Sequence, residues 1–248
     1  GEFCKFSGSN GTAPESGLVI ESDIDRNFSC FKDISFDKCE FIANKGWGVL
    51  VSQKCNPTDI KISNSLVRHS GSGGIWNCSV KTTISGNVFN YNGDVAIRSV
   101  RYESRSNDTL KVDNNLIKNE KIGVDYLGIG AVISENVFDS ISHFGIQLNG
   151  LTKDSTHATI TNNSFSNCAS SCIKINRFRS CDILNNGFFG FSKNGISITS
   201  SRARIESNKY IDLESGLNIN YSEVVFIKNV FNQCVKDVVK GERATLLE

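Results

Sequence analysis

A repeated phrase constrains the fold of this chain more than any other feature of its sequence. Its clearest copy is Ile133-x-x-Asn136-x-Phe138, followed after a turn by Gly145-Ile146. The same order of aliphatic, Asn, large apolar, small and aliphatic residues returns along the chain, with successive Asn residues 21 to 28 positions apart. Such a period is typical of a solenoid, in which each repeat is one structural unit.

Aligning the copies produces four columns of similar residues. The first aliphatic column reads Phe36, Ile62, Ile84, Val112, Ile133, Ile160, Ile183, Ile205, Phe226. The large apolar column reads Phe41, Val67, Phe89, Ile117, Phe138, Phe165, Phe188, Tyr210, Phe231. The small column reads Gly48, Gly74, Ala96, Gly123, Gly145, Cys172, Gly195, Gly216. The aliphatic column after it reads Val49, Ile75, Ile97, Val124, Ile146, Ile173, Ile196, Leu217.

These columns predict a stack of coils, each with three short β-strands. No single coil can bury its apolar residues alone, but stacking at the ~4.8 Å spacing of paired strands turns each column into a continuous core stripe. We therefore expect an all-β fold, a single parallel β-helix domain over residues 1–248 with about nine to ten coils, its repeats spanning about residues 18–239. The terminal Gly1-Glu2-Phe3 and Leu247-Glu248 are expected to be cloning-derived or capping ends.

One polar column stands beside the apolar ones. It reads Asn87, Asn115, Asn136, Asn163, Asn186, Asn208, Asn229, after Cys39 and Ser65 in the first two coils. Asn tolerates the left-handed backbone of tight turns, and each stacked amide can donate to one neighbouring coil while it accepts from the other. The column therefore indicates a buried asparagine ladder with a structural role, in preference to a polar binding strip.

The charge of the chain limits the classes of partner. It has 27 basic and 26 acidic residues, a formal net charge of +1. A balanced charge gives no field to attract nucleic acid or an anionic membrane, and no run approaches the ~18 apolar residues of a membrane helix. We therefore expect neither nucleic acid nor a membrane as a partner.

The nine cysteines allow two interpretations. In a disulfide framework eight of them would pair, whereas in a reduced chain they would act as small apolar residues. Cys39, Cys172 and Cys181 occupy coil positions that other repeats fill with Asn, Gly or a small apolar residue, which favours packing and free thiols. The spacing of Cys168 and Cys172 remains compatible with one bridge.

The phrase and its Asn column resemble the right-handed parallel β-helix repeat of the pectate-lyase-like superfamily, over about Leu18 to Val239. Members of that superfamily are mostly polysaccharide lyases, glycoside hydrolases, uronate epimerases and phage tailspikes, and a minority are adhesins or interaction scaffolds. The resemblance implies a polysaccharide or other glycan as partner, and an extracellular, periplasmic or virion-surface location. The tailspikes add the possibility of a homotrimer.

The resemblance also implies a place for the site. In the superfamily, substrates lie along the outside of the strand that here carries the small-aliphatic pair. The residue after that pair points outward, because strand side chains alternate. The outward row reads Leu50, Trp76, Arg98, Asp125, Gln147, Lys174, Ser197, Asn218. A flanking row, two residues before the small position, reads Gly46, Ser72, Asp94, Lys121, His143, Ser170, Lys193, Glu214.

The third to sixth coils thus predict a charged groove for an acidic glycan. Trp76 would stack on a sugar ring, while Arg98 and Lys174 would hold carboxylates. His143 would be the general base or acid near neutral pH, with Asp125 as its partner. The remaining predicted binding residues are Gln147, Lys121 and Asp94. A long loop with Arg101, Tyr102, Glu103 and Arg105 is expected beside Arg98.

The favoured function is binding, with cleavage or epimerisation, of an acidic polysaccharide. The sequence lacks the Asn-Thr-Asp, Asp-Asp and Gly-His-Gly set of polygalacturonases, the Asp-Pro-His of alginate epimerases and the Arg-x-Pro-x-x-Arg region of pectate lyases. A glycosidase pair of Asp94 and Asp125 is expected to be too widely separated. No zinc or calcium spacing occurs, and we expect no cofactor and no metal. The alternative is a non-catalytic β-helix: an adhesin, a tailspike body or a protein-interaction scaffold.

Overall fold

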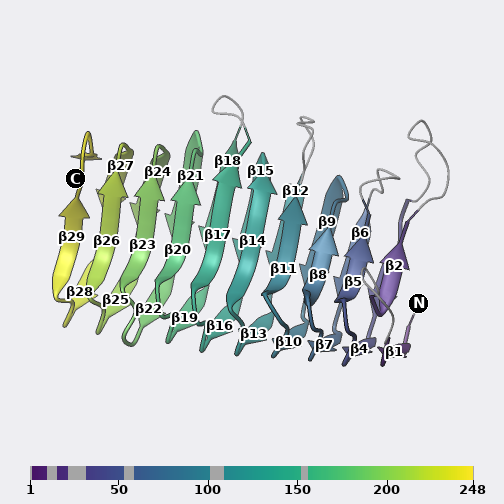
Figure 1. Ribbon diagram of the computed structural model, residues 1–248. Helices are drawn as coiled ribbons and strands as arrows, with labels where there is room; N and C mark the ends of the chain where they lie inside the picture. The colour runs from purple at the N-terminus through teal and green to yellow at the C-terminus, as the bar shows by residue number, and fades with distance from the viewer. Residues whose placement is uncertain are drawn as a thin grey trace.

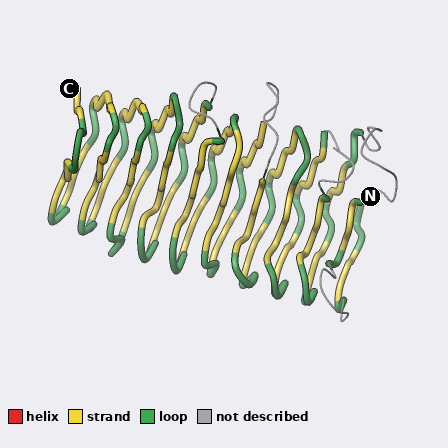
Figure 2. Tube along the Cα trace, turned by 45° about the horizontal axis from the view of Figure 1, so that its top comes forward, coloured by secondary structure: helices red, strands yellow, loops and turns green. Residues whose placement is uncertain are grey.

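The structure of the chain, a computed structural model, describes residues 2–9, 16–21, 32–52, 59–100, 109–151 and 156–247. Three parallel sheets of ten strands each surround one axis, and these described residues contain no helix. Successive strands belong to sheet A, sheet B and sheet C in turn, so that each coil adds one strand to every sheet (Figure 1). Figure 2 shows the coils stacked as a regular solenoid with its two termini at opposite ends.

The strands of each sheet have the following bounds. Sheet A consists of β3 (Ser35–Asp37), β6 (Ile60–Ser63), β9 (Lys81–Ser85), β12 (Thr109–Asp113), β15 (Gly130–Ser134), β18 (His157–Thr161), β21 (Ser180–Leu184), β24 (Arg202–Glu206), β27 (Glu223–Ile227) and β30 (Thr245–Leu247). Sheet B consists of β1 (Lys5–Ser7), β4 (Glu40–Ile42), β7 (Leu66–Arg68), β10 (Val88–Asn90), β13 (Leu116–Lys118), β16 (Val137–Asp139), β19 (Ser164–Ser166), β22 (Gly187–Phe189), β25 (Lys209–Ile211) and β28 (Val230–Asn232). Sheet C consists of β2 (Leu18–Ile20), β5 (Trp47–Val51), β8 (Gly73–Asn77), β11 (Val95–Val100), β14 (Ile122–Gly128), β17 (Phe144–Gly150), β20 (Ser171–Asn176), β23 (Asn194–Thr199), β26 (Ser215–Asn220) and β29 (Lys236–Lys240).

The strand register confirms the predicted core columns. One pair from each sheet is Ile133 with Ile160, Phe138 with Phe165, and Ile146 with Ile173. All six side chains are fully buried. The rings of Phe138 and Phe165 stack with their centroids 4.7 Å apart, close to the ~4.8 Å strand spacing. The core is thus built by stacking like residues along the axis.

The small column is needed because the backbone of the next coil comes very close. A Cβ atom on Gly123 would lie 2.4 Å from the carbonyl oxygen of Gly145 and 2.7 Å from the ring of Phe138. One on Gly145 would lie 2.6 Å from the carbonyl oxygen of Cys172. Side chains larger than those of Gly, Ala or Cys would therefore separate the coils near the start of the sheet C strands.

The asparagine ladder is present and buried. The Nδ2 of Asn136 donates to the Oδ1 of Asn163 at 3.0 Å, and the backbone N–H of Asn136 donates to the same oxygen at 3.0 Å. Equivalent side-chain bonds run without a break from Asn87 to Asn229. The ladder continues toward the N-terminus through Ser65, whose N–H donates to Asn87.

The expected backbone role of these asparagines was wrong. The left-handed conformation belongs to the residue directly before the ladder, as in Glu135, Asn162 and Asn185, with φ of 57°, 56° and 55°. Each ladder Asn instead supplies hydrogen bonds that satisfy the buried turn. Its amide group, more than any backbone tolerance, is what the position requires.

A second, shorter polar row lies in the turns between sheet B and sheet C, and the columns did not reveal it. The backbone N–H of Ser70 donates to Asn92 at 3.2 Å, and the Nδ2 of Asn92 donates to Glu120 Oε1 at 2.8 Å. Glu120 is only 2 % exposed. Burial raises the pKa of its carboxyl group to about 8, against the smaller lowering effect of the bonds from Asn92.

Among the described residues, seven cysteines are present and none of them is joined in a disulfide. Cys168 and Cys172 are both fully buried and remain unbridged. The pKa of Cys168 is raised, first by its hydrogen bond with Cys172 and then by burial. Cys30 and Cys55 lie outside the described residues.

The solenoid extends further at both ends than the repeat indicated. β1 pairs with β4, and β30 pairs with β27, so that strands lie on both sides of the predicted span of residues 18–239. The ten strands of each sheet are close to the expected nine to ten coils.

Candidate functional site

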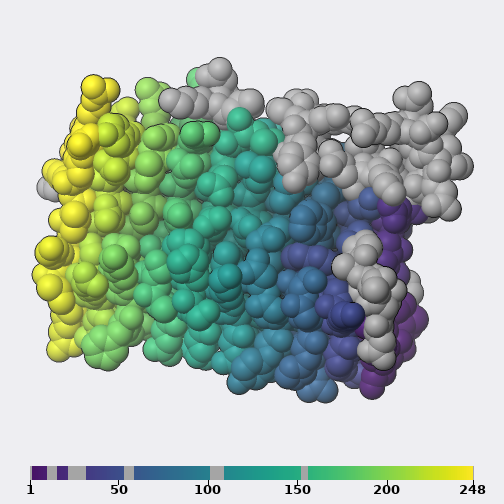
Figure 3. Space-filling view, in the orientation of Figure 1, coloured from purple at the N-terminus to yellow at the C-terminus, as the bar shows by residue number. Residues whose placement is uncertain are grey.

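The outer face of sheet C carries the predicted outward row in register. Trp76 pairs with Arg98, Arg98 with Asp125, Asp125 with Gln147, and Gln147 with Lys174. Each of these side chains is partly exposed. Figure 3 looks onto this face, from the purple N-terminal coils to the yellow C-terminal ones. The repeat therefore places five residues from five coils, distant in sequence, in one line.

Arg98 lies at the centre of a charged network. Its Nε donates to Asp125 Oδ2 at 3.0 Å, and its Nη2 donates to Asp94 Oδ2 at 3.0 Å. Lys121 Nζ donates to Asp94 Oδ1 at 2.8 Å, and Gln147 Nε2 donates to Asp125 Oδ1 at 3.2 Å. The network joins five of the predicted site residues, and its two cations balance its two anions.

The network determines what the two carboxylates can do. The hydrogen bond from Lys121, helped by that from Arg98, lowers the pKa of Asp94 against the opposing effect of burial. Asp125 accepts hydrogen bonds from both Arg98 and Gln147. Asp94 and Asp125 contact the same guanidinium, that of Arg98. The expected wide separation of these two carboxylates is therefore not what excludes them as a glycosidase pair. Such a pair needs a protonated acid, and ion-paired acceptors do not suit that role.

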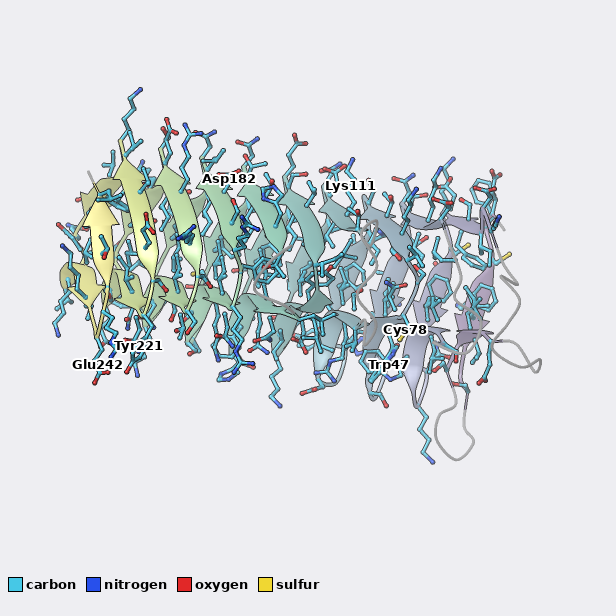
Figure 4. All side chains as sticks on the ribbon, turned by 90° about the horizontal axis from the view of Figure 1, so that it is seen from above. Trp47, Cys78, Lys111, Asp182, Tyr221 and Glu242 are labelled. Carbon is cyan, nitrogen blue, oxygen red and sulfur yellow. The ribbon has the colours of Figure 1, made fainter. Side chains whose placement is uncertain are left out.

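An aromatic cluster borders the network. The rings of Trp47 and Trp76 meet edge to face with their centroids 5.2 Å apart. The guanidinium carbon of Arg98 lies 5.9 Å from the centroid of each ring. Trp76 Nε1 also donates to Cys78 Sγ at 3.1 Å, and Figure 4 shows Trp47 and Cys78 near one another on this side of the solenoid. The cluster is a partly apolar surface held beside a cation.

Sequence reasoning missed Trp47. It directly precedes the small position Gly48, where other coils have Val95, Ile122 and Phe144. These four residues form a second apolar cluster outside the main core. The signal was a large apolar residue directly before the small column, at a position that the alignment of columns left out.

His143 and Lys174 form a separate group around Phe144. The ring of His143 lies 3.9 Å from that of Phe144, centroid to centroid, and Lys174 Nζ lies 4.5 Å from the Phe144 centroid. His143 is exposed. The described contacts do not join His143 to Asp125 or to Arg98. The structure therefore divides the predicted site into the Arg98 network and the Phe144 group.

Other expectations for this face concern neighbouring segments and metals. Arg101, Tyr102, Glu103 and Arg105 lie outside the described residues. In the part of the chain that is described, no group of three or more His, Cys, Asp or Glu side chains is arranged to hold a metal ion. No helix there has the length and apolar character needed to cross a membrane.

The comparison with protein families agrees with the architecture. The profile of the right-handed β-helix region matches residues 100–241, more than half of the chain. The chain belongs to the right-handed β-helix family. Comparisons with curated proteins and with solved structures gave no match. Membership of the β-helix family gives the fold, and a function for this β-helix has to be argued from its own site.

Proposed function

We propose that this β-helix binds an acidic polysaccharide along the outer face of sheet C, across β8, β11, β14, β17 and β20. The observation that carries the proposal is the unbroken line of Trp76, Arg98, Asp125, Gln147 and Lys174 on successive strands. Strands repeat every ~4.8 Å, and a sugar unit of an extended polymer spans roughly one such step.

The aromatic end of the line suits a sugar ring. Trp76 is partly exposed and is fixed by its contact with Trp47 and its hydrogen bond to Cys78. A fixed indole offers an apolar face at little cost in side-chain entropy. Beside it, the carboxylates and amide of the Arg98 network have further lone pairs and N–H groups for sugar hydroxyls.

The cationic end suits a carboxylate. Lys174 rests on the ring of Phe144, and none of the described carboxylates pairs with it. Arg98 already has two carboxylate partners, so we assign it the role of holding Asp94 and Asp125 in place. Lys174 is then the residue that attracts the uronate group, whereas the sequence had assigned this role to both cations.

Binding is tested with polygalacturonate, alginate and hyaluronan, and with dextran as a neutral comparison. Trp76→Ala and Lys174→Gln should each weaken binding to an acidic polymer about tenfold, the loss from one charge-assisted or aromatic contact. Lys209→Gln removes the same charge from an exposed position on sheet B and should leave binding unchanged. The effect of Lys174→Gln should shrink as salt screens the charge. Equal loss in Lys174→Gln and Lys209→Gln would reject this face as the site.

Cleavage or epimerisation is a second candidate, because His143 and Lys174 meet on Phe144. Lys174 would neutralise the uronate carboxylate, and a ring nitrogen of His143 would take the proton α to it. The electron pair of that C–H bond then passes toward the carboxylate. Loss of the 4-oxygen substituent, protonated by water, leaves a C4=C5 double bond, whereas return of a proton on the opposite face inverts C5.

This chemistry has its own readout. Elimination raises the ultraviolet absorbance of an unsaturated uronate, and epimerisation incorporates deuterium from the solvent at C5. His143→Ala should abolish turnover and keep binding. Wild-type turnover in that variant would remove His143 from the mechanism. Binding without turnover by the wild-type protein would instead favour a non-catalytic role, as an adhesin, a tailspike body or an interaction scaffold.

A further inference from the structure

The last coils carry a groove at the turns between sheet C and sheet A, away from the Arg98 network. Its volume is about 720 Å³. Its polar lining comes from three arginines, one glutamate and several hydroxyl groups. They include Arg179, Arg202, Arg243, Glu223, Ser200 and Tyr221. Figure 4 shows Tyr221 beside Glu242 at the C-terminal end of the solenoid, far along the axis from Trp47.

A short serine ladder fixes the floor of this groove. The backbone N–H of Phe178 donates to Ser201 Oγ at 3.0 Å, and the N–H of Ser201 donates to Ser222 Oγ at 3.1 Å. Both hydroxyls donate in turn to a backbone carbonyl two residues earlier in the chain. Both serines are 5 % exposed. The floor is therefore a hydrogen-bonded part of the solenoid that needs no ligand to form.

The wall of the groove is cationic. Arg202 and Arg243 against Glu223 leave an excess of one positive charge among these three lining residues. Arg202 Nε pairs with Glu223 Oε2 at 3.3 Å, but the two side chains are 70 % and 49 % exposed. Such exposed ion pairs contribute little to stability. An incoming anion can therefore compete with Glu223 for the guanidinium of Arg202. Arg243, which also lines the groove, has no carboxylate partner among the described residues.

The spacing of the arginines favours an anion with oxygens in several directions. Arg179 directly precedes β21, Arg202 opens β24 and Arg243 precedes β30, so the three side chains start from different levels of the stack. A carboxylate has two oxygens in one plane, whereas a sulfate or phosphate ester presents three terminal oxygens around a tetrahedral centre. The groove also far exceeds the ~30 Å³ that one water occupies in the liquid, so it has room for the organic part of an ester.

We propose that this groove binds a small sulfate or phosphate ester, with the anion between Arg202 and Arg243 and the hydroxylated organic part over Ser200 and Tyr221. Tyr221 is 45 % exposed. Its hydroxyl group donates a hydrogen bond to Glu242, which holds the ring at the groove. This site lies at the turns between sheet C and sheet A, whereas the proposed glycan site is the outer face of sheet C, so the two are independent.

The test uses the whole chain and titration calorimetry with glucose 6-phosphate and glucose 6-sulfate at millimolar concentrations. Binding of either ester, with glucose itself not binding, is the expected result, and the tighter of the two identifies the source of the oxyanion. Glucuronate should bind more weakly than both. Equal binding of glucuronate, or equal binding of inorganic phosphate and glucose 6-phosphate, would overturn the proposed ligand class.

Variants separate this groove from general surface charge. Arg202→Gln and Arg243→Gln should each weaken ester binding about tenfold or more, since each removes a charge-assisted contact. Arg177→Gln is the matched control, because Arg177 lies in the same kind of turn, has φ of 59° where Arg243 has 47°, and does not line the groove. All three should unfold at the wild-type temperature. A loss of binding in Arg177→Gln as large as in Arg243→Gln would show nonspecific attraction and overturn the site.

Discussion

Arg98 on β11 and Asp125 on β14 are register partners that also form an ion pair, with Nε and Oδ2 3.0 Å apart. Their side chains are 23 % and 19 % exposed, so solvent screens the pair only in part. Asp94, from the preceding turn, binds Nη2 of the same guanidinium. One arginine thus connects the strand face to the turn that flanks it.

A double-mutant cycle measures the interaction energy between Arg98 and Asp125. Arg98→Ala, Asp125→Ala and the double variant should give a coupling energy near 1 kcal/mol, at the upper end of values for exposed pairs. Denaturant unfolding gives the free energies. The matched cycle on Arg202 and Glu223, which are far more exposed, should give a smaller coupling. Equal couplings would mean that the partial burial around Arg98 has no energetic effect.

Asn163→Ala should lower the free energy of unfolding by ~1–3 kcal/mol, because the variant leaves buried turn groups without partners. Asn163 Nδ2 bonds Asn186 and the carbonyl of Ile133, and its Oδ1 accepts from Asn136. Asn232→Ala, at an exposed position, is the control and should unfold like the wild type. Glycan binding per folded molecule should be unchanged. Unchanged melting with lost binding would instead make the ladder a binding strip.

Glu120 should make stability fall as the pH rises. Its pKa of about 8 in the folded state lies above its ordinary value of 4.5, so between these values the folded chain holds a proton that the unfolded chain has lost. Ionising the buried carboxyl group lowers the free energy of unfolding. This penalty is absent below pH 4.5, grows between the two pKa values and is complete above about pH 8. The difference between these two pKa values corresponds to a penalty on the order of 5 kcal/mol.

Glu120→Gln isolates this effect, since the amide oxygen can still accept from Asn92 while the charge is gone. The variant should gain stability over the wild type mainly at alkaline pH, as measured by denaturant unfolding near pH 5 and near pH 9. Glu214→Gln, an exposed change in the same kind of turn, should gain nothing. A gain of the same size at both pH values would contradict titration of Glu120 as the cause.

Tyr210→Phe should stabilise the protein. Tyr210 is fully buried between Phe188 and Phe231, and its hydroxyl group has no hydrogen-bond partner among the described residues. An unsatisfied buried hydroxyl costs ~1–3 kcal/mol, and Phe keeps the stacked ring. The thermal unfolding temperature should be higher in Tyr210→Phe than in the wild type. It should be unchanged in Tyr91→Phe, because Tyr91 is exposed. A lower melting temperature in Tyr210→Phe would indicate that the hydroxyl group is satisfied in solution.

The fold was predictable because one rule repeats. Apolar residues at fixed positions can be aligned without knowing the structure, and the pairing of Ile133 with Ile160 followed directly from that alignment. The ends escaped because β1 and β30 lie outside the complete copies of the phrase. The buried position of Glu120 escaped because a charged residue in a turn is usually solvated.

For the candidate site, the sequence predicted only which side chains point outward from the strands. Alternation along the strand placed Arg98 and Asp125 on one face, but it did not show that Arg98 is held by two carboxylates. Such partnerships depend on rotamers and turn geometry, which a column of letters does not contain. For the same reason His143 lies against Phe144, although the sequence suggested Asp125 as its partner.

The ladder has a consequence for how the molecule opens. Each Asn bonds to its neighbours in the stack, as Asn136 does with Asn115 and Asn163, so a coil at the end has a neighbour on one side only. The solenoid should therefore unfold locally from its two terminal coils inward. Amide exchange should be slowest around Arg98 and Asp125 and fastest in the terminal coils. A ligand seated across several central strands would then meet a surface that is already rigid, whereas one in the arginine-lined groove would also hold the fraying tip closed.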